Sequence, residues 1–210
     1  MKREERYQRI LDYFRSTNPH VTTELHFGSV FQLLVATMLS AQCTDKRVNL
    51  VTPDLFATFP TAKAMADADE SEIYELIKSV SYPNAKARHL REMANMIVGK
   101  FKGDVAYSFE DLVSLPVVGR KTANVIEAVA YQKASMPVDT HVFRVSHRLG
   151  LVSKSAKIPY LVEQQLKKNI PQNDIANAHH WLILHGRYIC KSRKPQCYIC
   201  PFDDFCPKNI

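Results

Sequence analysis

The amino-acid sequence predicts an all-α fold, and three observations support this class. Apolar residues recur at helical spacing almost throughout, no segment alternates as a strand would, and capping residues precede the apolar runs. A chain of 210 residues is long enough to bury a core in one or two compact domains. We therefore expect a helical protein with at most two domains.

The expected helices share an apolar face and, in most cases, a capping residue or proline at a boundary. In chain order they cover residues 7–14, 29–41 after a Ser29–Gln32 capping box, 84–101 with Asn84 as cap, 108–114 with Ser108 as cap, 121 to a point before Pro137, a segment after its cap Asp139, 163–168 and 174–188.

Charge and apolar content indicate where such a chain acts. The net charge of +7 and the isoelectric point near 9.1 favour a polyanionic partner. The first six residues are charged and lack an apolar core, and the apolar run 30–41 is too short to cross a bilayer. We expect an intracellular, cytoplasmic protein without a membrane span, monomeric because no heptad pattern appears.

Four cysteines crowd the end of the chain. They are Cys190, Cys197, Cys200 and Cys206, and only Cys43 lies elsewhere. An odd cysteine count and no export signal argue against disulfides. Four thiolates in this stretch can hold one Zn²⁺ or one iron–sulfur cluster, and spacing alone leaves both alternatives open.

A short turn separates two predicted helices at residues 115–119. Leu115 precedes Pro116, which cannot continue the first helix, and Gly119 permits a tight turn before the next helix. Backbone N–H groups at the start of that second helix can bind a phosphate without reading a base. An ordinary turn between helices is the alternative.

Lys121 and Asp139 are the candidate chemical groups. Lys121 falls in the first turn of its helix, where the dipole disfavours a cation, and partial burial would further favour the neutral amine of a nucleophile. Asp139 could accept a proton or stabilise a cation, although a plain helix cap explains it equally well. A lysine that only contacts phosphate is the alternative for Lys121.

Five segments in order resemble endonuclease III, the bifunctional DNA glycosylase family of the helix–hairpin–helix superfamily. They are residues 39–45, 115–123, 137–145 and 180–187 and the cysteine tail 190–206. The resemblance implies a six-helix barrel domain over 22–133, with the hairpin near 108–130. It also implies a second domain from 1–21 and 134–210 that holds a 4Fe–4S cluster on the four terminal cysteines.

The resemblance also implies an activity on double-stranded DNA. Lys121 would be the nucleophile that releases oxidised or ring-saturated pyrimidines and cuts abasic sites by β-elimination, with Asp139 as the assisting carboxylate. Gln42 and Tyr82 would occupy the gap left by the flipped base. The remaining expected DNA contacts are Leu115, Val117, Gly119, Arg120, His141, Lys191 and Arg193. The carbonyl groups of Val113, Leu115 and Val118 would hold a monovalent cation.

Two positions depart from the family pattern. Val117 replaces the first glycine of the usual Leu-Pro-Gly-Val-Gly turn, and valine is strained there if φ must be positive. Tyr82 replaces a leucine. Two other functions stay open: an adenine-mismatch glycosylase, which usually carries serine at the position of Lys121, and a catalytically silent iron–sulfur protein that binds DNA.

Overall fold

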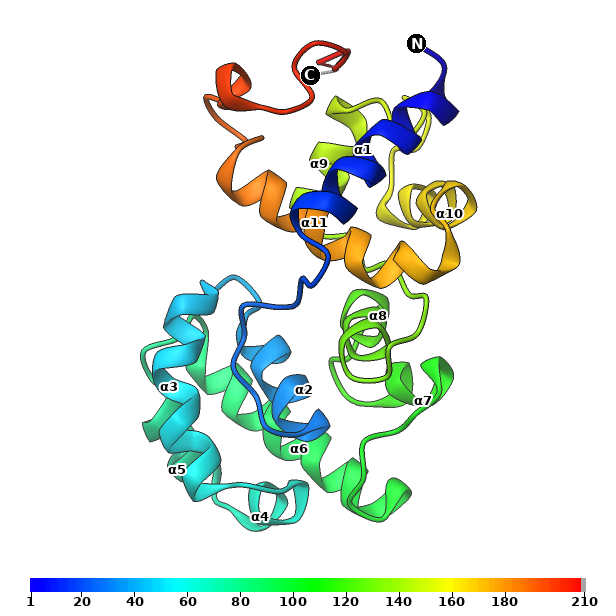
Figure 1. Cartoon of the computed structure of the whole chain (residues 1–210). Helices are drawn as coiled ribbons and strands as arrows, with labels where there is room; N and C mark the ends of the chain where they lie inside the picture. The colour runs from blue at the N-terminus through cyan, green and yellow to red at the C-terminus, as the bar shows by residue number, and fades with distance from the viewer. Residues whose placement is uncertain (209–210) are drawn as a thin grey trace. The chain divides into compact units, whose positions relative to one another are not determined.

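The computed structural model describes residues 1–208, which form two compact units (Figure 1). We call Thr23–Tyr131 the central unit, and Met1–Thr22 together with the chain from Gln132 onward the terminal unit. Within the described residues the regular elements are α-helices and two short 3₁₀ turns, without strands. The predicted all-α class is confirmed.

The central unit contains seven helices. They are α2 (Val30–Leu39), α3 (Asp45–Thr58), α4 (Ala62–Asp67), α5 (Glu70–Ile77), α6 (Pro83–Phe101), α7 (Phe109–Ser114) and α8 (Arg120–Val129). Helices α3, α4 and α5 were not predicted individually from the sequence. Pro53 lies inside α3, and α4 and α5 span only 6 and 8 residues, so their apolar periodicity is hard to separate from that of a loop.

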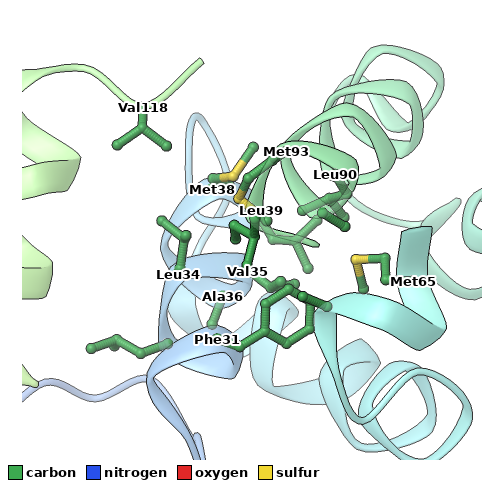
Figure 2. Packing of buried hydrophobic residues seen from close by; sticks show 14 of the residues in the cluster. Phe31, Leu34, Val35, Ala36, Met38, Leu39, Met65, Leu90, Met93 and Val118 are labelled. Atoms are coloured by element: carbon green, nitrogen blue, oxygen red, sulfur yellow. The ribbon is translucent and has the colours of Figure 1, made fainter. Parts of the chain in front are cut away.

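Helix α2 is the centre of this core because nearly all of its side chains are apolar. Every residue from Phe31 to Leu39 except Gln32 is buried, and the helix contacts α3, α6 and α8. Figure 2 shows Leu90 and Met93 of α6 close to this helix, with Val118 projecting toward the cluster from the turn before α8. A helix that is apolar on all sides is stable only when neighbours surround it.

The terminal unit joins the two ends of the chain. Its elements are α1 (Arg3–Thr17), α9 (Thr140–Arg148), α10 (Pro159–Asn169), η1 (Gln172–Asp174), α11 (Ile175–Tyr188) and η2 (Cys197–Ile199). Trp181 of α11 stacks on Phe14 of α1 with ring centroids 5.5 Å apart. Its indole Nε1 donates a 2.8 Å hydrogen bond to the carbonyl of Asn18, so this buried ring keeps its polar atom paired.

Most of the predicted caps are present. The Ser108 hydroxyl accepts a hydrogen bond from the amide of Asp111, and the Ser29 hydroxyl accepts one from the amide of Gln32. The second half of the predicted capping box is wrong, because the Gln32 side chain accepts from the amide of Gly28 instead. None of the helices described over residues 1–208 has the length and apolar composition needed to cross a membrane.

The predicted start of the helix at Asn84 is also wrong. Helix α6 begins at Pro83, and Tyr82 is its cap residue, with the left-handed angles φ 55° and ψ 51°. Proline is favoured in the first turn because its missing N–H would be unpaired there in any case. Asn84 therefore lies inside the helix and does not cap it.

Candidate functional site

The turn between α7 and α8 has a strained residue at its exposed tip. The amide of Val118 donates a 3.2 Å hydrogen bond to the carbonyl of Leu115, which closes the turn. Val117 between them has φ 63° and its side chain is 59% exposed. A left-handed conformation costs about 1–2 kcal/mol for an L-residue, and β-branched residues rarely adopt it.

The residue with a positive φ angle in this turn is therefore Val117 and not Gly119. Gly119 has φ −85°, an extended backbone that any residue adopts, and a Cβ added to it would meet no atom within 4 Å. The expectation that Gly119 supplies the turn's conformational freedom is wrong. The concern that valine occupies a position of positive φ is confirmed.

Helix α8 begins directly after this turn, and no side chain caps its N-terminus. Its cap residue Gly119 has no side chain to accept from the first amides, and no acidic residue lies in the first turn. The first amides of a helix carry the positive end of its dipole and bind anions. Arg120 adds a cation here, with its guanidinium 5.0 Å from the Phe109 ring centroid.

Lys121 lies in the first turn of α8 and is exposed. The partial burial considered from the sequence is therefore not found. Its side chain lines a cavity of about 270 Å³ within the central unit. Helices α2, α6 and α8 and the turns beside them supply the wall, which also includes Gln42, Tyr82 and Val117. The fold thus gathers four of the predicted site residues around one cavity.

Gln42 and Tyr82 are displayed by two turns with the same unusual backbone. Each has φ 55°, and both side chains are exposed. The Ser81 hydroxyl donates a 2.7 Å hydrogen bond to the Gln42 carbonyl, although 39 residues separate them. Ser81 was not predicted from the sequence, because nothing local distinguishes it.

Lys86 is a second residue that was not predicted from the sequence. It lines the same cavity yet is only 8% exposed, and burial lowers the pKa of its amino group. Its Nζ donates hydrogen bonds of 2.7 Å to the carbonyl of Leu39 and 2.8 Å to that of Ala41. Lys86 shares the buried face of α6 with Leu90 and Met93, so its helical register with these apolar residues is the sequence signal that could have indicated its burial.

Asp139 and His141 lie in the terminal unit, whereas Lys121 lies in the central unit. Asp139 caps α9, its carboxylate accepting a 2.8 Å hydrogen bond from the Val142 amide. The residue is half-buried. His141, in the first turn, has its Nδ1 3.3 Å from the Arg144 guanidinium.

The four terminal cysteines line one cavity of about 60 Å³ in the terminal unit. Burial raises the pKa of Cys200 to about 11 and raises that of Cys206. Buried thiols of this kind ionise readily only when a positive centre compensates the charge. Across residues 1–208, no three His, Cys, Asp or Glu side chains are arranged around a point that suits a single metal ion.

The donor set of this cavity is compatible with a sulfur-ligated group. All four thiols line one shared cavity, together with Asp203, and four cysteine sulfurs are the ligand set that iron–sulfur clusters use. His185 also faces this cavity, its Nε2 3.7 Å from the Cys200 sulfur, and burial lowers the pKa of His185 to about 4.

Two arginines of α9 hold the backbone of the cysteine loop. Arg148 donates hydrogen bonds of 2.6 Å to the Lys191 carbonyl and 3.1 Å to the Ser192 carbonyl. Arg144 donates to the Cys190 carbonyl at 3.1 Å. These two positioning residues were not predicted, because their partners lie more than 40 residues away. Lys191 and Arg193 on the loop are exposed.

Comparison with known proteins gives a consistent result. Residues 35–172 match the HhH-GPD superfamily of base excision DNA repair proteins. Endonuclease III of Synechocystis sp. is 45% identical over 206 residues, covering 98% of this chain and 93% of the relative. Endonuclease III of Escherichia coli K12 is 41% identical over 197 residues, covering 94% and 92%.

The chain belongs to the endonuclease III family. A solved structure of a trapped endonuclease III–DNA covalent intermediate, an estranged-adenine complex, matches with a TM-score of 0.93 and 37% identity, covering 100% of this chain and 98% of that one. A thermostable thymine-DNA glycosylase, 20% identical with a TM-score of 0.87, shares the fold.

Membership in the endonuclease III family confirms two predictions from the sequence. The fold is that of the helix–hairpin–helix glycosylases, and the enzyme class is DNA glycosylase with abasic-site lyase activity. The roles of individual residues, the lesions and the cluster stay predictions. Val117 and Tyr82, the two positions expected to depart from the family pattern, both have a left-handed backbone and are both exposed at the same cavity.

Proposed function

We propose that this chain excises oxidised or ring-saturated pyrimidines from duplex DNA and then cuts the strand at the resulting abasic site. The observation that carries the proposal is the position of Lys121. Its exposed side chain lines a cavity of about 270 Å³. The same residue lies in the first turn of α8, where backbone amides can bind a phosphate.

In the proposed reaction the neutral amine of Lys121 attacks C1′ of the damaged nucleotide, and the bond from C1′ to the base breaks. Loss of the ring oxygen from C1′ then leaves a Schiff base between Lys121 and the opened sugar. Removal of a proton from C2′ expels the 3′ phosphate by β-elimination. Asp139 would accept protons and stabilise positive charge on the sugar.

DNA binding would use two kinds of contact. Backbone amides around Leu115, Val117 and Gly119, with the Arg120 side chain, would bind phosphates near the lesion. His141, Lys191 and Arg193 of the terminal unit would bind phosphates as well, in keeping with the net charge of +7. The Leu115 carbonyl accepts one hydrogen bond within the turn and keeps a second lone pair. Together with the carbonyl groups of Val113 and Val118, it would bind a monovalent cation.

Gln42 and Tyr82 would fill the space left by the flipped nucleotide. Both are exposed at the same cavity as Lys121, and an aromatic ring such as Tyr82 can stack between bases. A filled gap keeps the damaged nucleotide outside the duplex while Lys121 reacts.

The four terminal cysteines would hold a 4Fe–4S cluster. When bound, the cluster supplies a covalent anchor for the loop 190–206, which keeps Lys191 and Arg193 in place. Iron and inorganic sulfide should therefore be found in equal amounts in the purified protein. Zinc in their place would contradict this assignment.

The catalytic proposal is tested by borohydride trapping on duplexes that carry one thymine glycol or one abasic site. The wild-type protein should form a covalent adduct with both, and Lys121→Gln should form neither while retaining affinity for abasic DNA. Lys63→Gln is the matched control, since Lys63 is an exposed helical lysine paired with Asp67. An adduct of wild-type yield from Lys121→Gln would refute the role of Lys121.

A further inference from the structure

Two turns of the central unit meet at the cavity that Lys121 lines. One turn follows α2 and displays Gln42, and the other precedes α6 and displays Tyr82. Both residues have φ 55°, a conformation that non-glycine residues avoid unless surrounding contacts enforce it. Hydrogen bonds that hold the backbone of Gln42 and Tyr82 in this conformation are contacts of this kind.

Ser81 and Lys86 supply these contacts from the same side. The Ser81 hydroxyl donates a 2.7 Å hydrogen bond to the Gln42 carbonyl. The Lys86 Nζ donates to the Ala41 carbonyl at 2.8 Å, and its backbone amide donates to the Tyr82 carbonyl at 3.1 Å. The Lys86 side chain therefore bonds the chain directly before Gln42, and its backbone bonds Tyr82 through the first helical hydrogen bond of α6.

The burial of Lys86 indicates that these bonds matter to the protein. A lysine amino group is costly to remove from water unless hydrogen bonds replace the lost hydration. Here the carbonyls of Leu39 and Ala41 provide them at the C-terminal end of α2, where the helix dipole favours a cation. A lysine that stayed in water would not lose its hydration, so the burial of Lys86 is consistent with a structural role for these two hydrogen bonds.

We infer that Ser81 and Lys86 act as a clamp that positions Gln42 and Tyr82 for filling the gap beside a flipped nucleotide. This inference rests on the proposed function of Gln42 and Tyr82. Without the clamp, the two left-handed turns would relax toward commoner backbone conformations. Their side chains would then leave the geometry in which they replace the missing base.

The test uses Ser81→Ala and Lys86→Met in the full chain. Single-turnover base release is measured on a thymine glycol duplex, and the fluorescence of 2-aminopurine opposite the lesion reports the stacking of the orphaned base. We expect base release to slow about fivefold for Ser81→Ala, which loses one neutral hydrogen bond. We expect it to slow about tenfold for Lys86→Met, because one of its two charged hydrogen bonds, the one to Ala41, is made next to Gln42. The 2-aminopurine signal should change in both.

Matched controls separate positioning from general damage. Ser16→Ala removes a hydroxyl that donates to a helix carbonyl in α1, and Lys63→Met removes an exposed helical lysine. Both should react at the wild-type rate. If Lys86→Met fails to fold by circular dichroism, Ser81→Ala decides the question, because Ser81 is partly exposed and its loss leaves no buried cavity.

A combined substitution tests whether Ser81 acts through Gln42 and Tyr82. In a background with both Gln42→Ala and Tyr82→Ala, Ser81→Ala should slow base release no further, because the side chains that it positions are gone. A full additional loss would overturn the clamp. Wild-type rates in Ser81→Ala and Lys86→Met, while Gln42→Ala or Tyr82→Ala is slow, would overturn the clamp alone. Wild-type rates in Gln42→Ala and Tyr82→Ala would overturn the gap-filling proposal and the clamp with it.

Discussion

The guanidinium of Arg148 bonds to the Lys191 carbonyl at 2.6 Å, and its Nη1 lies 3.7 Å from the Cys190 sulfur. A side chain of α9 thus contacts both the first cysteine of the terminal loop and the backbone after it. Since a carbonyl and a sulfur both accept from one cation, this arginine stabilises the loop and any negative charge on the thiolate.

Replacing Arg148 should therefore weaken the cysteine loop. We expect Arg148→Gln to lose the visible absorbance of the proposed cluster several times faster than wild type under air, because the loop backbone loses two hydrogen bonds. Arg88→Gln is a suitable control, since Arg88 forms an exposed ion pair with Glu92 within α6 of the central unit. Equal bleaching rates in the two variants would show that Arg148 does not protect the cluster.

Val117→Gly should relieve strain at the tip of the hairpin. Glycine adopts φ 63° without steric cost, but it also gains entropy in the unfolded chain, so the net stabilisation should be about 0.5–1 kcal/mol. Affinity for undamaged duplex, measured at fixed salt, should also rise. As a control, Val98→Gly within α6 should destabilise, because a helix interior disfavours glycine. A loss of stability in Val117→Gly would contradict the assigned strain.

Burial of His180 should make stability depend on pH. Burial lowers the pKa of His180 to about 4, with the charge of Arg187 as a second cause, whereas the unfolded chain retains about 6.5. Between these values the unfolded state binds more protons, so stability is fully present above pH 6.5 and is lost as pH falls toward 4. We expect a loss of about 2 kcal/mol from this residue between pH 7 and 5.

Chemical denaturation at several pH values measures this contribution. His180→Gln should show a shallower fall in unfolding free energy between pH 7 and 5 than wild type. The exposed His20, changed to Gln, should keep the wild-type slope. Parallel curves for wild type and His180→Gln would mean that this histidine does not change its protonation on unfolding.

Lys191 should contribute to DNA binding through charge alone. Replacing it with Gln removes one phosphate contact, so the slope of log affinity against log salt should become shallower by about 1 for every sequence tested. Lys63→Gln, whose charge is already paired within α4, serves as the comparison. An unchanged slope in Lys191→Gln would place this loop residue away from the DNA backbone.

Several features could be predicted from the sequence because they depend on neighbours in the chain. The caps at Ser108 and Asp139 bond to amides three residues away, and the helical faces follow the period of the apolar residues. The crowding of four cysteines in seventeen residues similarly indicates a shared site, because thiols so close in the chain can reach one centre.

The tertiary structure decided what depends on residues far apart in the chain. The bond from Ser81 to Gln42, the burial of Lys86 and the contact between Arg148 and Lys191 each require separate helices to pack together. The backbone angle of Val117 likewise follows from how α7 and α8 meet. Periodicity and capping determine the longer amphipathic helices, because both act between residues close in the chain, whereas only packing determines which side chains are placed around a cavity.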